Sequence, residues 1–222
     1  TPELYELGNR FNLDVYALDK SWSMLENFWP GLKENATCTN WLSLNTFVNE
    51  PSIITNDGGF HLLTFDEQKT FVDSLKDKSF GNSVYIFRLF LPNEFNLTSE
   101  QIYDMLIEGG ITNVNEMKYL LWFAVDLNLN GKIRVSDIWH SLILLSRGRI
   151  LEVLSRLGST DMMTKSLLFY QDNESIYSFL NLNEIESLFF GQAGLRLVDV
   201  SFPSYNLGKF FPIVKFAKEV SD

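Results

Sequence analysis

The segment that most constrains the fold is residues 126–137, DLNLNGKIRVSD, in which oxygen-bearing side chains alternate with leucines up to a glycine. Asp126, Asn128 and Asn130 hold the alternate positions, and Gly131 follows them. The chain must reverse at this glycine with a positive φ, which costs a residue with a side chain roughly 1–2 kcal/mol. The pattern predicts a tight loop whose oxygens converge on one point, where a divalent cation can bind.

Apolar residues recur at helical spacing on both sides of this loop. Leu121 and Val125 lie on the same predicted helix face before it. Ile138, Leu142 and Leu145 follow it with the same periodicity. Such spacing gathers apolar side chains on one side of a helix. The sequence therefore predicts a helix, the loop and a second helix.

This helix–loop–helix, over residues 113–146, resembles the EF-hand superfamily, to which calmodulin-like and calcineurin-B-like calcium-binding proteins belong. In that family's twelve-residue loop, positions 1, 3 and 5 supply side-chain oxygens, position 7 a main-chain carbonyl and position 12 a carboxylate. The resemblance implies a metal site at the corresponding residues, which are Asp126, Asn128, Asn130, Lys132 through its carbonyl, and Asp137.

Ca²⁺ is the cofactor that the resemblance implies, with two alternatives left open. Asp137 has one methylene fewer than the Glu that is usual at position 12, and a smaller, six-coordinate site favours Mg²⁺. Lys132 and Arg134 offset the two acids of the loop, whereas tight sites concentrate negative charge. A loop that binds no ion and serves packing is the third possibility.

A second hand is expected downstream, because a lone EF-hand leaves its hydrophobic face and its loop strand unpaired. Residues 181–184 form an Asn-x-x-Glu capping box, which is typical of a helix start. With this box as the end of the second loop, its first position is Asn173, and Ser178 stands where glycine is needed. This loop is expected to hold no ion. Its Leu180 is predicted to pair with Ile133 of the first loop.

The N-terminal half allows two interpretations. Residues 63–67 resemble the end of another EF-hand loop, but the residues before them lack its ligands. Alternatively, residues 56–59 form the turn of a β-hairpin between Ile53–Ile54 and Phe60–Leu63. Farther along, residues 83–91 are rich in β-branched and aromatic residues and are typical of a strand.

Two further segments predict local structure. Thr98–Gln101 is a capping box that starts a helix through about Leu106, and Gly109–Gly110 ends it. Residues 209–218 are basic and aromatic in an otherwise acidic chain, and basic amphipathic segments are what EF-hand grooves bind. This segment is either an intramolecular ligand of the groove or an ordinary element that completes the core.

Together these features predict a mainly α fold of paired EF-hand lobes with short β-bridges between their loops. The N-terminal half is divergent, and an α+β arrangement is the alternative for it. The predicted domains are a divergent lobe at 1–97, an EF-hand pair at 98–191 and a C-terminal extension at 192–222.

The predicted function is that of a calcium-binding regulatory protein that binds a partner protein through an apolar groove. The alternative is a metal-independent adaptor or a structural subunit of a larger assembly. The expected partner is a basic or amphipathic helix, because the net charge is −10. That charge argues against nucleic acid, which needs Lys and Arg to replace phosphate counterions. No apolar run approaches the ~20 residues that span a bilayer.

Catalytic motifs are absent from the sequence, which has no G-x-S-x-G, Walker, G-x-G-x-x-G or H-E-x-x-H pattern. The two histidines, His61 and His140, lie in no recognisable constellation. The chain is therefore predicted not to be an enzyme. Cys38 is the sole cysteine, which favours a reducing compartment, so the predicted location is intracellular, in the cytoplasm.

Overall fold

A four-stranded mixed sheet organises the larger part of the chain. The computed structural model describes residues 2–42, 52–76, 83–92, 97–125, 131–146, 148–160, 167–168 and 170–218. The strand order in this sheet is β3-β4-β8-β7. Strands β3 and β4 are parallel, whereas β8 runs antiparallel to both of its neighbours. These strands are β3 (Ile53–Asp57), β4 (Val84–Arg88), β7 (Leu195–Ser201) and β8 (Ile213–Lys218).

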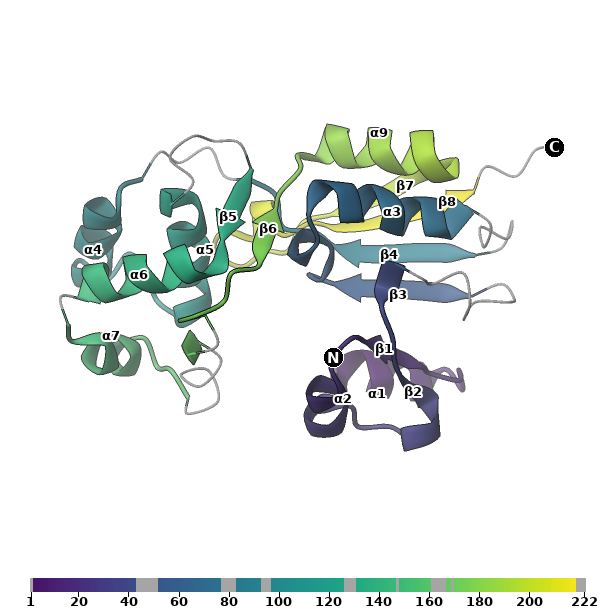
Figure 1. Ribbon diagram of the computed structural model, residues 1–222, viewed down its shortest axis with the longest axis horizontal. Coiled ribbons are helices and arrows are strands. Elements are labelled where there is room, and N and C mark those ends of the chain that lie inside the picture. The colour runs from purple at the N-terminus through teal and green to yellow at the C-terminus, as the bar shows by residue number, and fades with distance from the viewer. Residues whose placement is uncertain are drawn as a thin grey trace.

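One face of this sheet is covered by two helices, α3 (Phe65–Lys76) and α9 (Leu182–Ala193) (Figure 1). Alternate residues of a strand point to opposite faces, and in β4 Tyr85 and Phe87 are fully buried while their neighbours are partly exposed. The Phe216 ring of β8 stacks on Phe189 of α9, with ring centroids 4.2 Å apart. The core of this unit therefore lies between the sheet and the two helices.

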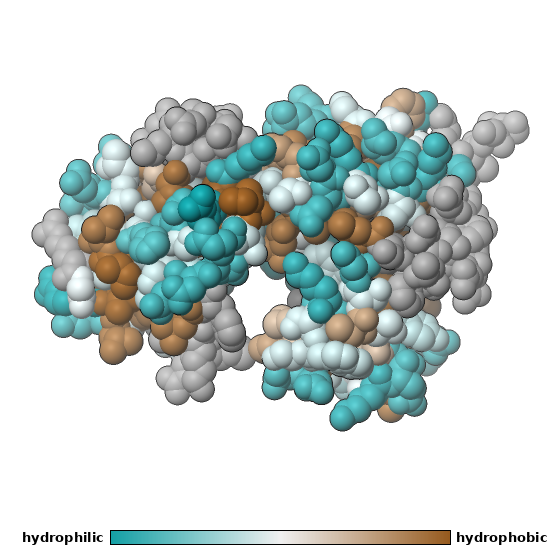
Figure 2. All heavy atoms as spheres, in the orientation of Figure 1, coloured by the Kyte–Doolittle hydropathy of each residue, from teal (hydrophilic) through white to brown (hydrophobic). Residues whose placement is uncertain are grey.

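A helical unit follows β4 and lies beyond one end of the sheet (Figure 1). Its own core consists of apolar residues from α5 and from the helices packed against it, with Met117 and Leu121 fully buried. Its helices are α4 (Ser99–Ile107), α5 (Val114–Val125), α6 (Val135–Ser146) and α7 (Ile150–Arg156). Exposed apolar side chains also gather on the surface of this unit, Leu144 and Leu151 among them (Figure 2).

A two-stranded antiparallel ribbon connects the helical unit to the sheet unit. It pairs β5 (Lys132–Arg134) with β6 (Ile176–Ser178), and Ile133 lies opposite Tyr177. The predicted pairing of Ile133 with Leu180 is wrong, because the chain turns away after Ser178 toward the cap of α9. Asn181 and Glu184 form the capping box predicted there, with both of its hydrogen bonds present.

The N-terminal segment forms a small unit of its own. Its strands pair in parallel, and the Tyr5 and Trp29 rings meet edge to face at 5.1 Å. The Trp41 indole N–H donates to the carbonyl of Leu18, which ties the end of this unit back to its first strand. Its elements are α1 (Pro2–Arg10), β1 (Ala17–Asp19), α2 (Trp22–Phe28), the 3₁₀ turn η1 (Lys33–Asn35) and β2 (Ala36–Cys38).

The prediction of a mainly α fold is wrong, since the described part of the chain is an α/β structure built around a mixed four-stranded sheet. The N-terminal hairpin is wrong as well. Residues Phe60–Leu62 form a 3₁₀ turn, η3, and α3 crosses over to bring β4 parallel to β3. A parallel partner needs such a crossover, and α3 provides it by burying Phe71, Val72 and Leu75.

Three local predictions are confirmed. The strand expected in 83–91 is β4, and the helix after Thr98 is α4, with its capping box formed. The segment 209–218 completes the core, since the short turn η4 (Gly208–Phe210) leads into β8, which lies inside the sheet. It is therefore not a ligand of an apolar groove. The predicted domain boundaries stay a prediction. No helix in the described ranges is long and apolar enough to cross a membrane.

Candidate functional site

The carboxyl ends of β3 and β4 form the edge of the sheet that faces the helical unit. In open α/β sheets, ligands bind outside the carboxyl ends of the parallel strands. The two strands end here in an ion pair between Asp57 and Arg88, both partly exposed. Beyond Asp57 the chain turns at Gly58, whose φ is +73°, and the Asn56 side chain accepts a hydrogen bond from the N–H of Gly59 at 2.8 Å. The edge therefore presents charged groups on a tight turn.

His61 lies directly behind this turn in a box of aromatic rings. Its imidazole stacks on Phe90 at 4.3 Å and on Phe179 at 5.4 Å, and it contacts Trp122 at 5.5 Å between ring centroids. Burial lowers the pKa of His61 to about 3, and the nearby positive charges of Lys118 and Arg88 act in the same direction. The imidazole is therefore neutral at physiological pH.

Buried polar atoms without a hydrogen-bond partner gather at this junction. In the described part of the chain, such side-chain atoms are His61 Nδ1, Gln68 Oε1, Arg88 Nε, Trp122 Nε1 and Ser178 Oγ. Arg88 retains its ion pair, which leaves four atoms without compensation. They are near one another, because Gln68 Nε2 donates to the carbonyls of Phe60 and Ser178. Each unpaired buried group costs about 1–3 kcal/mol, so their concentration here calls for an explanation.

A hollow opens beside this junction at the start of α3. Thr64 caps the helix, accepting from the N–H of Glu67 and donating to its carboxylate. The Lys132 ammonium lies 5.1 Å from the centre of the Phe65 ring, on the ribbon side of the hollow. The hollow thus lies between the capped start of α3 and the ribbon. Its lining residues are Thr64, Phe65, Asp66, Lys69, Lys132, Ile176 and Ser178.

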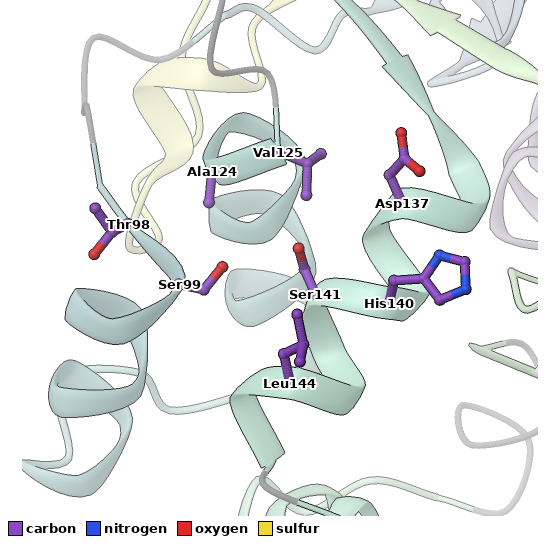
Figure 3. A pocket seen from close by; sticks show the side chains of 8 residues that line it. All are labelled: Thr98, Ser99, Ala124, Val125, Asp137, His140, Ser141 and Leu144. Carbon is purple, nitrogen blue, oxygen red and sulfur yellow. The ribbon is translucent and has the colours of Figure 1, made fainter.

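A second hollow lies within the helical unit, between α4, α5 and α6 (Figure 3). It includes Asp137, His140 and Ser141, three residue types that form catalytic triads when they hydrogen-bond in series. Figure 3 shows the His140 ring pointing away from Ser141. This arrangement does not form a nucleophile activated by a base. The remaining lining residues are Thr98, Ser99, Ala124, Val125 and Leu144.

The predicted metal ligands fall partly outside the described residues. Asp126, Asn128 and Asn130 are not described, and their role as ligands stays a prediction. Lys132 lines the hollow at α3, whereas Asp137 lines the hollow of Figure 3. Across the described ranges, no three His, Cys, Asp or Glu side chains come close enough together to hold a metal ion.

The sequence pattern missed the residues that meet at the junction. Ser178 is noticed in the sequence only as a substitute for glycine, and His61 only as a histidine outside any motif. Trp122 lies in the helix predicted before the loop at 126–137, and Gln68 belongs to no motif. Their neighbours are far away along the chain, so no local spacing could have identified them.

Comparisons with known proteins support the fold and not the predicted family. No protein-family model matches the sequence, and no curated protein matches it. A solved structure described as a putative Zn-dependent alcohol dehydrogenase from Rhodobacter sphaeroides is 13% identical, with a TM-score of 0.62. The match covers 98% of this chain and 80% of that one.

Two other solved structures are similar at lower scores. PKMT2 from Rickettsia typhi in complex with AdoHcy is 12% identical, with a TM-score of 0.49 over 91% of this chain and 44% of that one. TnmH is 13% identical, with a TM-score of 0.45 over 96% of this chain and 45% of that one. The chain thus spans less than half the length of either protein. Scores in this range identify no chemistry for it.

These findings correct four predictions. The chain is not a member of the EF-hand superfamily, because its main sheet and its likeness to the Rhodobacter sphaeroides structure indicate an α/β fold. The prediction of a calcium-binding regulatory protein or EF-hand adaptor is wrong with it. Ca²⁺ as the cofactor is corrected as well, because only the EF-hand resemblance implied it and the fold is α/β. The prediction that the chain is not an enzyme is also corrected, because a solved structure that shares its fold is described as a putative Zn-dependent alcohol dehydrogenase, so this fold does not exclude an enzyme.

Proposed function

We propose that the chain is the ligand-binding part of an α/β enzyme and that a small organic ligand binds at the carboxyl ends of β3 and β4. The observation that carries this proposal is the group of four unpaired buried polar atoms at that edge, on His61, Gln68, Trp122 and Ser178. Unpaired buried groups are rare in native proteins, and perturbed polar groups concentrate where ligands bind. A ligand with polar atoms at these positions would supply the missing partners.

The residues of this edge favour a ligand that is both polar and aromatic. Arg88 offers a guanidinium, which suits a carboxylate or a phosphate, and Asp57 offers a carboxylate, which suits hydroxyl or amino groups. Behind them, the rings of Phe90 and Trp122 stack at 5.6 Å and form an apolar wall. Nucleoside-containing cofactors combine these properties.

A fluorescence titration tests the proposal with two probes. The first is AdoHcy, which the Rickettsia typhi structure holds, and the second is NAD⁺. Trp122 lies in the aromatic box, so ligand binding at the edge should change the tryptophan emission. The Trp122→Phe variant should lose that change while calorimetry still detects binding. Binding of AdoHcy would indicate methyl transfer, because AdoHcy remains after S-adenosylmethionine gives up its methyl group. Binding of NAD⁺ would indicate hydride transfer.

A pair of arginine variants locates the bound probe. Arg88→Met should weaken binding about 10-fold to 100-fold, because a charge-assisted hydrogen bond contributes roughly 1.5–3 kcal/mol. The matched control is Arg196→Met on β7, since Arg196 lies over the ring of Phe190 at 5.3 Å as Arg88 lies over that of Phe90 at 5.7 Å. This control should bind as the unaltered protein does. Equal losses in both variants, or no binding of either probe, would contradict the proposal.

A further inference from the structure

We propose that the hollow at the start of α3 is a binding site for a phosphate group. The first N–H groups of a helix have no acceptor within it, and α3 is twelve residues long, so its start is electropositive. The N–H of Glu67 is occupied by Thr64 Oγ1 at 3.3 Å. The N–H groups of Phe65 and Asp66 remain as the first donors at the lining of the hollow.

Ser178 supplies a second and independent indication of a ligand. It comes from β6 and lines the hollow, although the residue is only 1% exposed and its hydroxyl has no partner. Two contacts hold it in place: its carbonyl accepts from Gln68 Nε2 at 2.9 Å, and β6 pairs with β5 opposite Lys132. A fixed hydroxyl without a partner beside a helix start matches the donor that a phosphate oxygen needs.

The charges around the hollow favour an anion. Lys69 and Lys132 line it with two ammonium groups, against one carboxylate, that of Asp66. Asp66 is almost fully exposed and lies 3.6 Å from Lys69, so solvent and this lysine reduce its repulsion of a bound anion. The lining carries one more positive than negative charge, which favours an anion over a neutral ligand. The Glu67 carboxylate lies outside the lining and accepts hydrogen bonds from the N–H and the hydroxyl of Thr64.

The site extends the proposed function by naming one chemical group of its ligand. The phosphate site rests on the proposed function only for where the rest of the ligand lies. The hollow itself can bind inorganic phosphate alone. A phosphate at α3 would favour a nucleotide such as NAD⁺ over AdoHcy, which carries none.

Thermal unfolding in phosphate buffer tests the site, with sodium chloride of equal ionic strength as the reference. Phosphate should raise the Tm of the unaltered protein above the chloride value, because a ligand of the folded state stabilises it. Ser178→Ala should weaken phosphate binding about tenfold by loss of a hydrogen bond to a charged group. The same variant should be at least as stable as the unaltered protein in chloride, since it removes a buried hydroxyl that has no partner. If Ser178 were purely structural, Ser178→Ala would lower stability in chloride and leave phosphate binding unchanged.

Two further variants complete the test. Ser146→Ala is the matched control, because Ser146 is equally buried but its hydroxyl donates to the carbonyl of Ile143 at 2.9 Å, away from the hollow. Its response to phosphate should equal that of the unaltered protein. Asp66→Asn should tighten phosphate binding a few-fold by removing the one carboxylate of the lining.

Adenosine 5′-monophosphate and adenosine distinguish free phosphate from a phosphate ester. Stabilisation by the nucleotide and not by the nucleoside would support an ester as the ligand, whereas stabilisation by inorganic phosphate alone would support the free ion. The inference is overturned if Ser178→Ala responds to phosphate like the unaltered protein, or if phosphate stabilises no more than chloride. Neither result affects the titrations with Arg88→Met, which test the proposed function separately.

Discussion

Stability should depend on pH through His61, and the magnitude follows from its burial. The pKa of this imidazole is lowered from its ordinary value of 6.5 to about 3 in the folded state. The unfolded chain therefore binds a proton between these two values while the folded chain does not. Stability is complete above pH 6.5 and falls as the pH decreases toward 3. The slope reaches about 1.4 kcal/mol per pH unit, which amounts to roughly 2 kcal/mol lost between pH 7 and pH 5.

The assay compares urea unfolding of the unaltered protein with that of His61→Phe at pH 7, 6 and 5. Phenylalanine has no titratable group and fits among the rings of Phe90, Phe179 and Trp122. The difference between the two free energies of unfolding isolates the histidine, because other titrations are common to both proteins. The free energy of unfolding of His61→Phe minus that of the unaltered protein should be roughly 2 kcal/mol larger at pH 5 than at pH 7.

His140 provides the control, because it is exposed on α6 and has no comparable aromatic box. His140→Phe keeps His61 and should therefore keep the pH dependence that His61 produces. The reasoning is refuted if the difference for His61→Phe is the same at all three pH values, since a neutral, desolvated imidazole must produce the slope. A slope of opposite sign would mean that His61 is stabilised in its protonated form by a partner.

Two further predictions test the packing. Phe216→Ala should cost roughly 3–5 kcal/mol in urea unfolding, because this fully buried ring stacks on α9 from the centre of the sheet. Phe202→Ala, at a half-exposed ring, should cost under 1 kcal/mol or so, and equal costs would disprove the position of β8 in the core. Gly131→Ala should cost about 1–3 kcal/mol more than Gly148→Ala, because both glycines have a positive φ but a Cβ at Gly131 would lie 2.6 Å from the carbonyl oxygen of Phe179. Similar losses would mean that the clash relaxes without cost.

Local patterns predicted local structure well in this chain. The capping boxes at Thr98 and Asn181 form as expected, since their hydrogen bonds span only three residues. Gly131 has the positive φ that its neighbours predict, at +69°. These features depend on the chain within one turn, where sequence spacing and geometry correspond closely.

The fold could not be predicted in the same way, because the pairing that defines it is between distant segments. Tyr85 lies opposite Phe216, and nothing in either strand indicates which partner it takes. The loop at 126–137 led to a helical family because its pattern is specific over twelve residues. A pattern of that length says nothing about the sheet to which its surroundings belong.

The unpaired buried atoms at the edge of the sheet should lower stability and promote ligand binding, and two substitutions measured together test both effects. Ser178→Ala and His61→Phe each remove a buried polar atom that has no partner, so each should stabilise the protein without ligand. Ser178 lines the hollow at α3, whereas His61 lies in the aromatic box beside it. Gln68 Nε2 donates to the carbonyls of Ser178 and of Phe60, the residue before His61, so the two effects on unfolding should couple in the double variant by roughly 0.5 kcal/mol or more. If both substitutions stabilise the protein and only Ser178→Ala weakens phosphate binding, the Ser178 hydroxyl donates to the ligand, whereas the His61 imidazole only packs in the aromatic box. If both substitutions destabilise the protein, these polar atoms already have partners without a ligand, and they do not indicate a binding site at this edge.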